Sequence, residues 1–464
     1  MKTELHIHFI GICGVAMSAL AIAAKNNGWK VTGSDAGFYP PVSDHLTQAG
    51  ISFYPGWHPE KILATEPPDL VVVGNVAASS NPEWEYVQQK QLPFVSYPEF
   101  ISRYLLKPES IVTAGTYGKT TTAAMLSWLL SQIGLKPSYM FGGLANNFPS
   151  AQITASHWSV LEGDEYKTAR WDQRPKFLSY APKYLLLTAV EWDHADIYPT
   201  AKDYVQTFTD LVASLPPSGC LVYCADNAGA VSTAAKTAIK KISYGQNPRA
   251  DYVYHLSRQN LNGLKISVQQ GEKTWTILSP LLGAYMAENI VGAFVLAKEL
   301  GWPEEKIIAG LASFPGIKRR LEKRYEKKIT VIDDIAHSPL KVPAVLATLR
   351  QTYLGKIWVV FEPNTGSRQN EAVPLYDQAF ALADIVIIPR LTKIKQDKDN
   401  PKSAWEGDEL AKIIGHTHKN VNYEPDDDRL IRRLKQETKE GDVIAFLGSH
   451  GFRGMIERLI QSLP

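Results

Sequence analysis

The stretch Ala114-Gly115-Thr116-Tyr117-Gly118-Lys119-Thr120 decides how this chain folds. The run Ser110–Ala114 predicts a strand that enters it, and Thr121–Gln132 predicts a helix that leaves it. Glycines at such a junction let backbone N–H groups surround phosphate oxygens, and the helix N-terminus favours their negative charge. The Lys119 ammonium would reach the β- and γ-phosphates, and the Thr120 hydroxyl would hold Mg²⁺. The stretch therefore predicts a phosphate-binding loop in a parallel α/β domain.

A plain glycine turn before a helix is the alternative interpretation of this stretch. The strict phosphate-loop pattern has a glycine five positions before Gly118, and Thr113 stands there. The Gly-Lys-Thr order between a strand and a helix is nevertheless demanding, and it favours phosphate binding over the plain turn.

The chain is longer than one hydrophobic core usually supports. Its 464 residues predict three domains, which we place at residues 1–107, 108–325 and 326–464. Apolar strand-like runs alternate with helical stretches, and this alternation predicts parallel, doubly wound sheets. The expected fold class is α/β, with Rossmann-like first and third domains and a central domain that carries the phosphate loop on a mostly parallel sheet. The strand-like runs besides Ser110–Ala114 are Leu5–Ile10, Trp29–Thr32, Asp69–Gly74, Trp158–Leu161, Tyr184–Ala189, Ile329–Ile332, Ile357–Phe361, Ile385–Ile388 and Val443–Leu447.

The charge balance gives no sign of a nucleic-acid or membrane partner, since 49 basic and 47 acidic residues leave a formal net charge of +2. Three cysteines are too few, and odd in number, for a disulfide framework, and they fit a reducing compartment. Cys220 and Cys224 lack a second cysteine or histidine pair, so we interpret them as strand residues rather than zinc ligands. No apolar run reaches the ~18 residues that span a bilayer, and the first residues lack the basic-then-apolar order of a signal peptide. The cytoplasm is the expected location.

Two acidic clusters follow strand-like runs of the central domain. Glu162-Gly-Asp164-Glu165 comes after Trp158–Leu161, and Asp193-His194-Ala-Asp196 comes after Tyr184–Ala189. Each cluster alone is typical of a solvated loop. Because both follow strands of the phosphate-loop domain, they are expected at the edge where parallel sheets bind ligands. Their oxygen ligands suit Mg²⁺, with His194 as a further ligand.

The first domain carries a shorter glycine motif. Gly11-Ile-Cys-Gly14 follows a strand-like run, but it is neither a full Gly-x-Gly-x-x-Gly motif nor unique to nucleotide binding. A dinucleotide site of the Rossmann type therefore stays open for this domain. His6 and His8 share one face of the strand, and we favour packed strand histidines over a metal pair.

Over its full length the chain resembles the Mur ligase family, and Ala114–Thr120 matches the family's ATP loop. The resemblance implies a UDP-binding first domain, a central ATPase domain and a third domain that binds the amino substrate. It also implies an ATP-dependent ligase with Mg²⁺ as cofactor, which joins an amino acid or short peptide to UDP-N-acetylmuramate. In that reaction the muramate carboxylate attacks the γ-phosphate, and the incoming amine displaces phosphate from the acyl phosphate to form the amide.

The resemblance also implies roles for particular residues. Lys119, Glu162 and His194 would be catalytic, and Thr120, Glu162 and His194 would hold the Mg²⁺. The implied contacts of ATP are Gly115, Thr116, Gly118, Lys119, Thr120, Thr121, Asn289, Arg320, Asp334 and His337. The implied contacts of the UDP substrate are Gly14, Ser34, Asp35 and Asn75.

Some of these residues lie in segments that depart from the family pattern. Gly283–Asn289 keeps only the last asparagine of the family's His-Asn-x-x-Asn motif, and Ser338 follows His337 where the family has a second histidine. Arg320 lies in the basic segment Lys318–Arg324, for which a solvated basic helix and a nucleic-acid patch are the alternative interpretations.

Within the family, the chain looks most like the murein-peptide ligase branch, and Glu162–Tyr166, Arg174–Phe177 and Glu191–Ile197 carry that likeness. That branch attaches the tripeptide L-Ala-γ-D-Glu-meso-diaminopimelate to UDP-N-acetylmuramate. The branch that adds L-alanine is the close alternative. Asn364 stands where the first branch has an arginine, so Arg368 is our candidate for binding a carboxylate of the peptide.

A third hypothesis, from a different class, is a non-catalytic nucleotide-binding regulator on the same fold. The presence of Lys119, Thr120, Glu162 and His194 disfavours it, because a scaffold without activity need not keep a metal site. The expected partners are small molecules, namely ATP, UDP-N-acetylmuramate and an amino acid or short peptide, with no nucleic acid and no membrane. A monomer and a homodimer both stay open.

Overall fold

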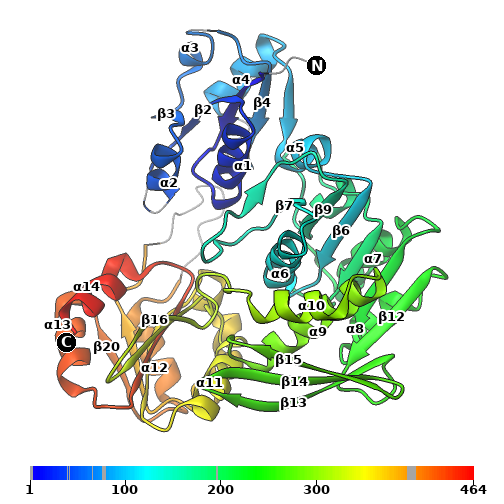
Figure 1. The fold of residues 1–464 in the computed structure, drawn as a ribbon. Coiled ribbons are helices and arrows are strands. Elements are labelled where there is room, and N and C mark those ends of the chain that lie inside the picture. Colours follow the sequence, from blue (N-terminus) through cyan, green and yellow to red (C-terminus); the bar gives the residue numbers. More distant parts are fainter. Residues whose placement is uncertain are drawn as a thin grey trace. The chain divides into compact units, whose positions relative to one another are not determined.

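The computed structural model of the chain describes residues 4–38, 40, 42–64, 66–75, 80–194, 197–393 and 404–463 (Figure 1). The chain divides into two compact units. The first unit comprises Met1–His255, Ile266–Ser279 and Tyr285–Pro315, and the second comprises Leu256–Lys265, Pro280–Ala284 and Gly316–Pro464.

The first unit begins with a five-stranded parallel sheet in the order β3-β2-β1-β4-β5. Alternate residues of β1 and β4 belong to two apolar clusters, one on each face of the sheet, so both strands are buried along their whole length. The direction in which strands are added reverses beside β1, and the Gly11–Gly14 loop follows β1 at that point. The elements are β1 (His6–Ile10), α1 (Val15–Asn26), β2 (Lys30–Asp35), α2 (Val42–Gln48), β3 (Ser52–Pro55), α3 (Pro59–Ile62), β4 (Leu70–Val73), α4 (Pro82–Gln89), β5 (Phe94–Ser96) and α5 (Tyr97–Tyr104).

A ten-stranded sheet follows, in the order β15-β14-β13-β12-β11-β10-β6-β9-β7-β8. Its central strands pair in parallel, and β8 is antiparallel to β7. Helix α6 is buried on nearly all sides because it packs on β6, β7 and β9 and against α10. The elements are β6 (Glu109–Ala114), α6 (Lys119–Gln132), β7 (Ser138–Met140), β8 (Ala151–Gln152), β9 (Trp158–Gly163), η1 (Lys176–Ser179), β10 (Tyr184–Leu187), α7 (Ala201–Ala213), β11 (Cys220–Cys224), α8 (Ala228–Ala234), β12 (Lys240–Gly245), β13 (Tyr252–Asn260), β14 (Gly263–Gln270), β15 (Lys273–Ser279), α9 (Ala284–Glu299) and α10 (Glu304–Ala312).

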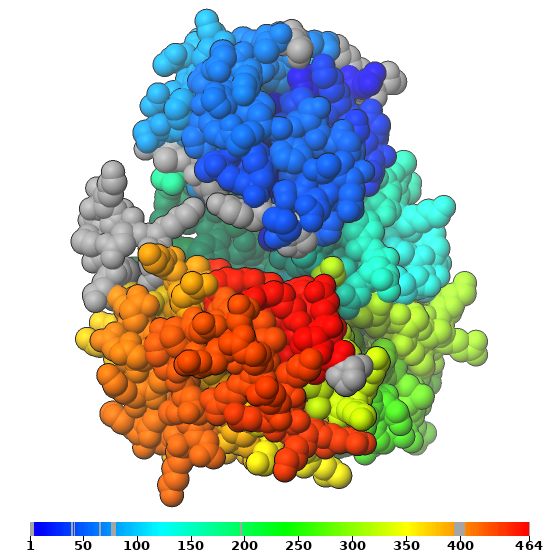
Figure 2. Space-filling model, turned by 90° about the vertical axis from the view of Figure 1, so that its left-hand side faces the viewer, coloured from blue at the N-terminus to red at the C-terminus, as the bar shows by residue number. Residues whose placement is uncertain are grey.

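The second unit contains a six-stranded sheet in the order β16-β17-β21-β18-β19-β20, in which β16 is antiparallel to β17 and the other pairs are parallel. Helices α13 and α14 pack against each other and form part of its orange-to-red surface (Figures 1 and 2). The elements are β16 (Glu322–Glu326), β17 (Thr330–Asp334), α11 (Val342–Thr352), β18 (Ile357–Glu362), η2 (Gly366–Arg368), η3 (Asn370–Tyr376), β19 (Ile385–Pro389), α12 (Gly407–Gly415), β20 (Val421–Glu424), α13 (Asp427–Glu437), β21 (Val443–Gly448), η4 (Phe452–Gly454) and α14 (Met455–Ser462).

The predicted α/β fold class is confirmed, and each strand-like run of the sequence overlaps an observed strand. Cys220 and Cys224 are free and buried in β11, as the strand interpretation requires. A basic helix over Lys318–Arg324 is excluded, because Arg319 and Leu321 have φ of 59° and 47° and strand β16 begins at Glu322.

The domain boundaries stay predictions. The predicted boundary between residues 325 and 326 falls inside β16, which pairs with β17 in the third sheet. Within the part of the chain that the structure describes, no helix combines the length and the apolarity that a bilayer span requires.

Candidate active site

The phosphate-loop candidate joins the end of β6 to the start of α6. Gly115 and Gly118 have φ of 145° and 83°, in the region that favours glycine. A Cβ on Gly115 would lie 2.1 Å from Thr188 Oγ1, and one on Gly118 would lie 2.5 Å from Asn289 Oδ1. Gly115 therefore excludes a side chain, and a side chain at Gly118 would be strained by its φ and would displace the Asn289 amide. The loop is fixed further by the Thr116 N–H, which donates to the Ala189 carbonyl at 2.9 Å.

Lys119, at the first position of α6, points to the carboxylate of Glu165. Its Nζ lies 3.1 Å from Oε1 and 3.1 Å from Oε2 of Glu165, a side chain with no exposed surface. Burial disfavours the charged form of Lys119, but Glu165 and the nearby carboxylates of Glu162 and Asp164 outweigh it and raise the pKa of the ammonium. The predicted phosphate-binding lysine is thus kept charged at the loop.

Thr120 and Glu162 are brought together at the same place. The Thr120 hydroxyl donates to Glu162 Oε1 at 2.6 Å, and the Gly142 N–H donates to Glu162 Oε2 at 2.5 Å. Burial raises the pKa of the Glu162 carboxyl, although Lys119 opposes the shift. A bound cation would lower the cost of holding this carboxylate in its charged form.

His194 lies on the other side of Glu165. Its Nε2 is 3.1 Å from Glu165 Oε1, and its Nδ1 is 2.8 Å from the Tyr166 hydroxyl. The backbone of His194 is left-handed, with φ of 58°, and its carbonyl accepts from the N–H groups of Ile197 and Tyr198 at 2.9 Å. Asp196, which belongs to the same predicted cluster, lies outside the described residues. The structure thus places Lys119, Thr120, Glu162 and His194 around one end of the sheet.

Of the four candidate UDP contacts, Gly14 and Asp35 lie at the loop after β1, whereas the side chains of Ser34 and Asn75 have partners elsewhere. Gly14 precedes the first turn of α1, and Asp35 Oδ2 accepts from the Cys13 N–H at 2.8 Å. Ser34 is fully buried, and its hydroxyl donates to the carboxylate of Glu83. Asn75 Nδ2 donates to the Lys167 carbonyl of the central domain at 3.2 Å. The roles of these residues stay predictions.

The two strand histidines of the first domain share one partner. His6 Nε2 lies 3.1 Å and His8 Nδ1 lies 2.9 Å from the Thr32 hydroxyl, and burial lowers the pKa of His8 to about 3. This placement agrees with packed strand histidines.

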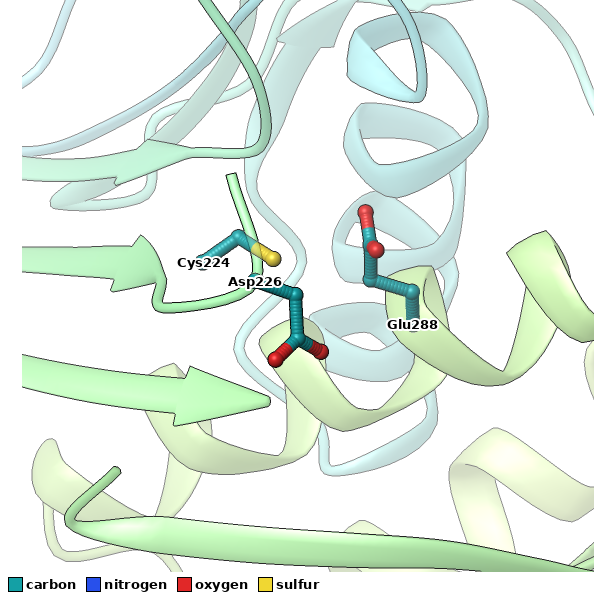
Figure 3. A group of neighbouring side chains, drawn as sticks. All are labelled: Cys224, Asp226 and Glu288. Carbon is teal, nitrogen blue, oxygen red and sulfur yellow. The ribbon is translucent and has the colours of Figure 1, made fainter. Parts of the chain in front are cut away.

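A second group of acidic side chains lies beside Asn289, the candidate ATP contact whose Oδ1 faces Gly118. Figure 3 shows Cys224 at the end of β11, Asp226 in the turn after it and Glu288 on α9. One ligand atom of each lies within 4.8 Å of the others. Burial raises the pKa of Glu288 to about 7, the hydrogen bond with Cys224 opposes this shift, and the nearby Asp226 and Glu191 add smaller upward contributions. This group was missed from the sequence, where only the neighbouring Asn289 gave a signal.

The remaining candidate ATP contacts lie in the second unit. Asp334 is buried at the end of β17, where its carboxylate accepts from the N–H groups of Leu321 at 2.7 Å and Ala336 at 2.8 Å. His337 Nδ1 lies 2.7 Å from the Ile335 carbonyl, and burial lowers the pKa of its imidazole to about 4. Arg320 is partly exposed next to Arg319. Their predicted contacts with ATP stay untested.

Arg319, beside the predicted Arg320, has a structural role that the sequence did not reveal. Its guanidinium lies 3.2 Å from Asp333 Oδ1 and donates to the carbonyls of Gly448, Ser449 and His450. These contacts fasten the turn before β16 to the end of β21.

Arg368, the candidate for a peptide carboxylate, is almost fully buried, with 3% of its surface exposed. Its Nε donates to the Trp405 carbonyl at 2.8 Å, and its Nη1 donates to the Thr392 carbonyl at 2.9 Å. The guanidinium therefore ties two backbone segments together. This placement favours a structural role over the predicted contact with a substrate.

A glycine-bounded phosphate loop that faces a lysine, carboxylates and a histidine at the strand ends of a parallel sheet defines an α/β enzyme that uses a nucleoside triphosphate. Comparison with known families specifies the class. The description "Mur ligase family, catalytic domain" matches residues 6–107, "Mur ligase middle domain" matches 112–297, and "Mur ligase, glutamate ligase domain" matches 319–450. The chain belongs to the Mur ligase family.

Similar proteins span the whole chain. The UDP-N-acetylmuramate–L-alanyl-γ-D-glutamyl-meso-2,6-diaminoheptandioate ligase of Haemophilus influenzae is 32% identical, over 99% of both chains. The UDP-N-acetylmuramate–L-alanine ligase of Geotalea daltonii is 28% identical over 98% of both. Among solved structures, a murein peptide ligase from Psychrobacter arcticus is 26% identical, covers 98% of both chains and has a TM-score of 0.70.

Proposed function

We propose that the chain is an ATP-dependent ligase that joins the carboxyl group of UDP-N-acetylmuramate to the amine of L-Ala-γ-D-Glu-meso-diaminopimelate. The similarity to the Haemophilus influenzae ligase named for this tripeptide, at 32% identity over nearly all of both chains, is the observation that carries the proposal. The phosphate loop and the charged side chains around it supply the groups that such a reaction needs.

Thr120 and Glu162 would hold the Mg²⁺ of this reaction, and His194 would join them by giving up the contact of its Nδ1 with the Tyr166 hydroxyl. The fit rests on the 2.6 Å contact between the Thr120 hydroxyl and Glu162, and on the raised pKa of that carboxyl, because both favour a hard cation at the loop. When bound, Mg²⁺ neutralises charge on the phosphate oxygens.

The protein's own groups position the reactants. The loop N–H groups and Lys119 bind the phosphates, because the three N–H donors of the Lys119 ammonium can reach β- and γ-phosphate oxygens while one stays on Glu165. The muramate carboxylate then attacks the γ-phosphorus, which gives an acyl phosphate and ADP. The amine attacks the acyl carbon and expels phosphate, so the products are the amide, ADP and phosphate. Catalysis of both steps depends on positioning and charge stabilisation.

L-Alanine is the second candidate for the amino substrate. Asn364 replaces the arginine expected for the tripeptide branch, and Arg368, the proposed substitute, is occupied by backbone carbonyls. These two observations favour a smaller substrate with fewer carboxylates. The nucleotide-binding regulator without activity is the third candidate. The arrangement of Lys119, Thr120 and Glu162 at the phosphate loop disfavours it, because a scaffold without activity need not keep a metal site.

Phosphate release with ATP, Mg²⁺ and UDP-N-acetylmuramate separates the three candidates. We expect kcat/KM for the tripeptide to exceed that for L-alanine by about tenfold or more, which corresponds to ~1.4 kcal/mol. A preference for L-alanine would establish the second candidate. If neither the tripeptide nor L-alanine supports phosphate release, the regulator without activity is the remaining candidate. The cytoplasmic location and the choice between monomer and homodimer stay predictions.

A further inference from the structure

Glu165 joins three segments of the chain at the phosphate loop. It follows β9, and its fully buried carboxylate meets Lys119 Nζ, from the start of α6, at 3.1 Å from both oxygens. The same carboxylate meets His194 Nε2, from the segment after β10, at 3.1 Å. One side chain thus sets the relative position of two residues that flank the predicted γ-phosphate site.

The neighbouring carboxylates have different partners. Glu162 accepts from the Thr120 hydroxyl and the Gly142 N–H, and Asp164 lies 2.6 Å from Lys176 Nζ. Neither is hydrogen-bonded to His194 among the contacts of the described residues. Asp193 Oδ1 lies 3.8 Å from His194 Nδ1, so within the described part of the chain Glu165 is the one carboxylate hydrogen-bonded to the side chains of both Lys119 and His194.

The contacts of His194 fix its ring at both nitrogens. Because the Glu165 carboxylate is an acceptor, Nε2 donates to it, and Nδ1 shares a hydrogen bond of 2.8 Å with the Tyr166 hydroxyl. The rings of Tyr166 and His194 also pack with centroids 4.4 Å apart. A histidine held at both nitrogens has a defined ring plane, which is how side chains next to a ligand are oriented.

We propose that Glu165 is a positioning residue, whose carboxylate aims Lys119 and His194 at the phosphate loop. The chemistry that it serves rests on the proposed function, whereas its effect on nucleotide binding does not. A buried carboxylate repels a triphosphate and competes with it for the Lys119 ammonium. Glu165 therefore contributes orientation for catalysis and contributes no affinity for ATP.

Glu165→Gln tests this division, because the amide keeps the shape and removes the charge. We expect kcat for ligation to fall about tenfold or more, whereas the Kd of ATP, measured by calorimetry without UDP substrate, stays the same or becomes lower. Glu165→Asp restores the charge on a shorter side chain, and it should retain more of kcat than Glu165→Gln does. A purely structural role predicts no such rescue by charge.

Glu109→Gln is the matched control. Glu109 also pairs with a lysine and a tyrosine, Lys183 at 2.7 Å and Tyr184 at 2.8 Å, but at the other end of β6. This variant should keep both kcat and the Kd of ATP, and thermal unfolding of all variants reports whether they fold.

Weaker ATP binding in Glu165→Gln with unchanged kcat would overturn the proposal, and so would equal losses of kcat in the Gln and Asp variants. If the wild-type chain performs no ligation, the proposed function fails, and the Kd of ATP still tests whether Glu165 contributes to nucleotide affinity. In that case unchanged or tighter ATP binding by Glu165→Gln supports the role of Glu165, and weaker binding contradicts it.

Discussion

Lys119 has its ammonium 3.1 Å from both oxygens of a fully buried glutamate, and only 16% of its side chain is exposed. A lysine so enclosed would lose its charge in an apolar setting, and the surrounding carboxylates prevent this. The Lys119 ammonium therefore stays charged around neutral pH, where it can bind phosphate oxygens.

Lys119→Ala is expected to abolish ligation and to leave the Kd of the UDP substrate within about threefold of the wild-type value, because the UDP contacts are predicted in another domain. Turnover and calorimetry on the same variant measure the two effects. Lys183→Ala, which removes a lysine from a similar pair with Glu109, is the control. Wild-type turnover in Lys119→Ala would refute the ATP-site assignment.

At Glu288, unlike at Lys119, the effect of burial outweighs that of the surrounding groups. Its carboxyl has a pKa of about 7 in the folded protein, against an ordinary value of 4.5, mainly because burial disfavours the charge. Between these two values the folded state binds a proton that the unfolded state does not bind, so stability falls as the pH rises through this window.

Glu288→Gln removes this titration. The variant should match the wild type in thermal midpoint at pH 4 and exceed it at pH 8, where the charged glutamate costs on the order of 3 kcal/mol. Thermal unfolding with a chelator present measures this, because Cys224, Asp226 and Glu288 together could hold a metal ion. An equal difference between variant and wild type at both pH values would show that burial does not shift this carboxyl.

At the scale of elements, the sequence predicted strands and the phosphate loop because their signals are local. Strand β6, the two glycines of the loop and helix α6 are contiguous, and their patterns need no knowledge of the rest of the chain. The partners of those elements could not be predicted in the same way. Glu165 meets Lys119 and His194 across separations of 46 and 29 residues, and only the folded sheet brings them together.

Arg368 shows why a partner is hard to predict from the sequence. It was predicted to bind a carboxylate because Asn364 stands where the tripeptide branch has an arginine, and its donors reach the backbone carbonyls of Thr392 and Trp405. Its role stays a prediction. The same limit applies to Glu288, since a glutamate next to Asn289 carries no signal that its carboxyl is buried against Asp226.

Arg368→Ala should therefore lower stability and leave substrate recognition intact. Loss of hydrogen bonds from a buried cation to two carbonyls is expected to cost about 2–4 kcal/mol, and the KM for the amino substrate should change less than about threefold. Thermal unfolding and steady-state kinetics at a temperature where the variant is folded measure the two effects. A KM raised about tenfold with unchanged stability would restore the carboxylate-binding role.

At the scale of the molecule, length and strand–helix alternation predicted three α/β domains, and the contacts divide the chain into two units with three sheets. The first sheet and most of the second lie in one unit, where Asn75 reaches Lys167 and Trp84 stacks on Trp171 with ring centroids 4.7 Å apart. Composition cannot predict such contacts, because they depend on which surfaces the two domains present to each other. We propose, from family membership, that the first domain of this chain binds UDP, the second binds ATP and the third binds the amino substrate.

The central claim is that ATP activates the muramate carboxylate as an acyl phosphate before the amine attacks. The most direct measurement starts from UDP-N-acetylmuramate with oxygen-18 in both carboxylate positions and analyses the released phosphate by mass spectrometry, with the tripeptide and with L-alanine. Our account predicts that each phosphate released during ligation carries one labelled oxygen and that the amide keeps the other. Amide formation accompanied by unlabelled phosphate would contradict it.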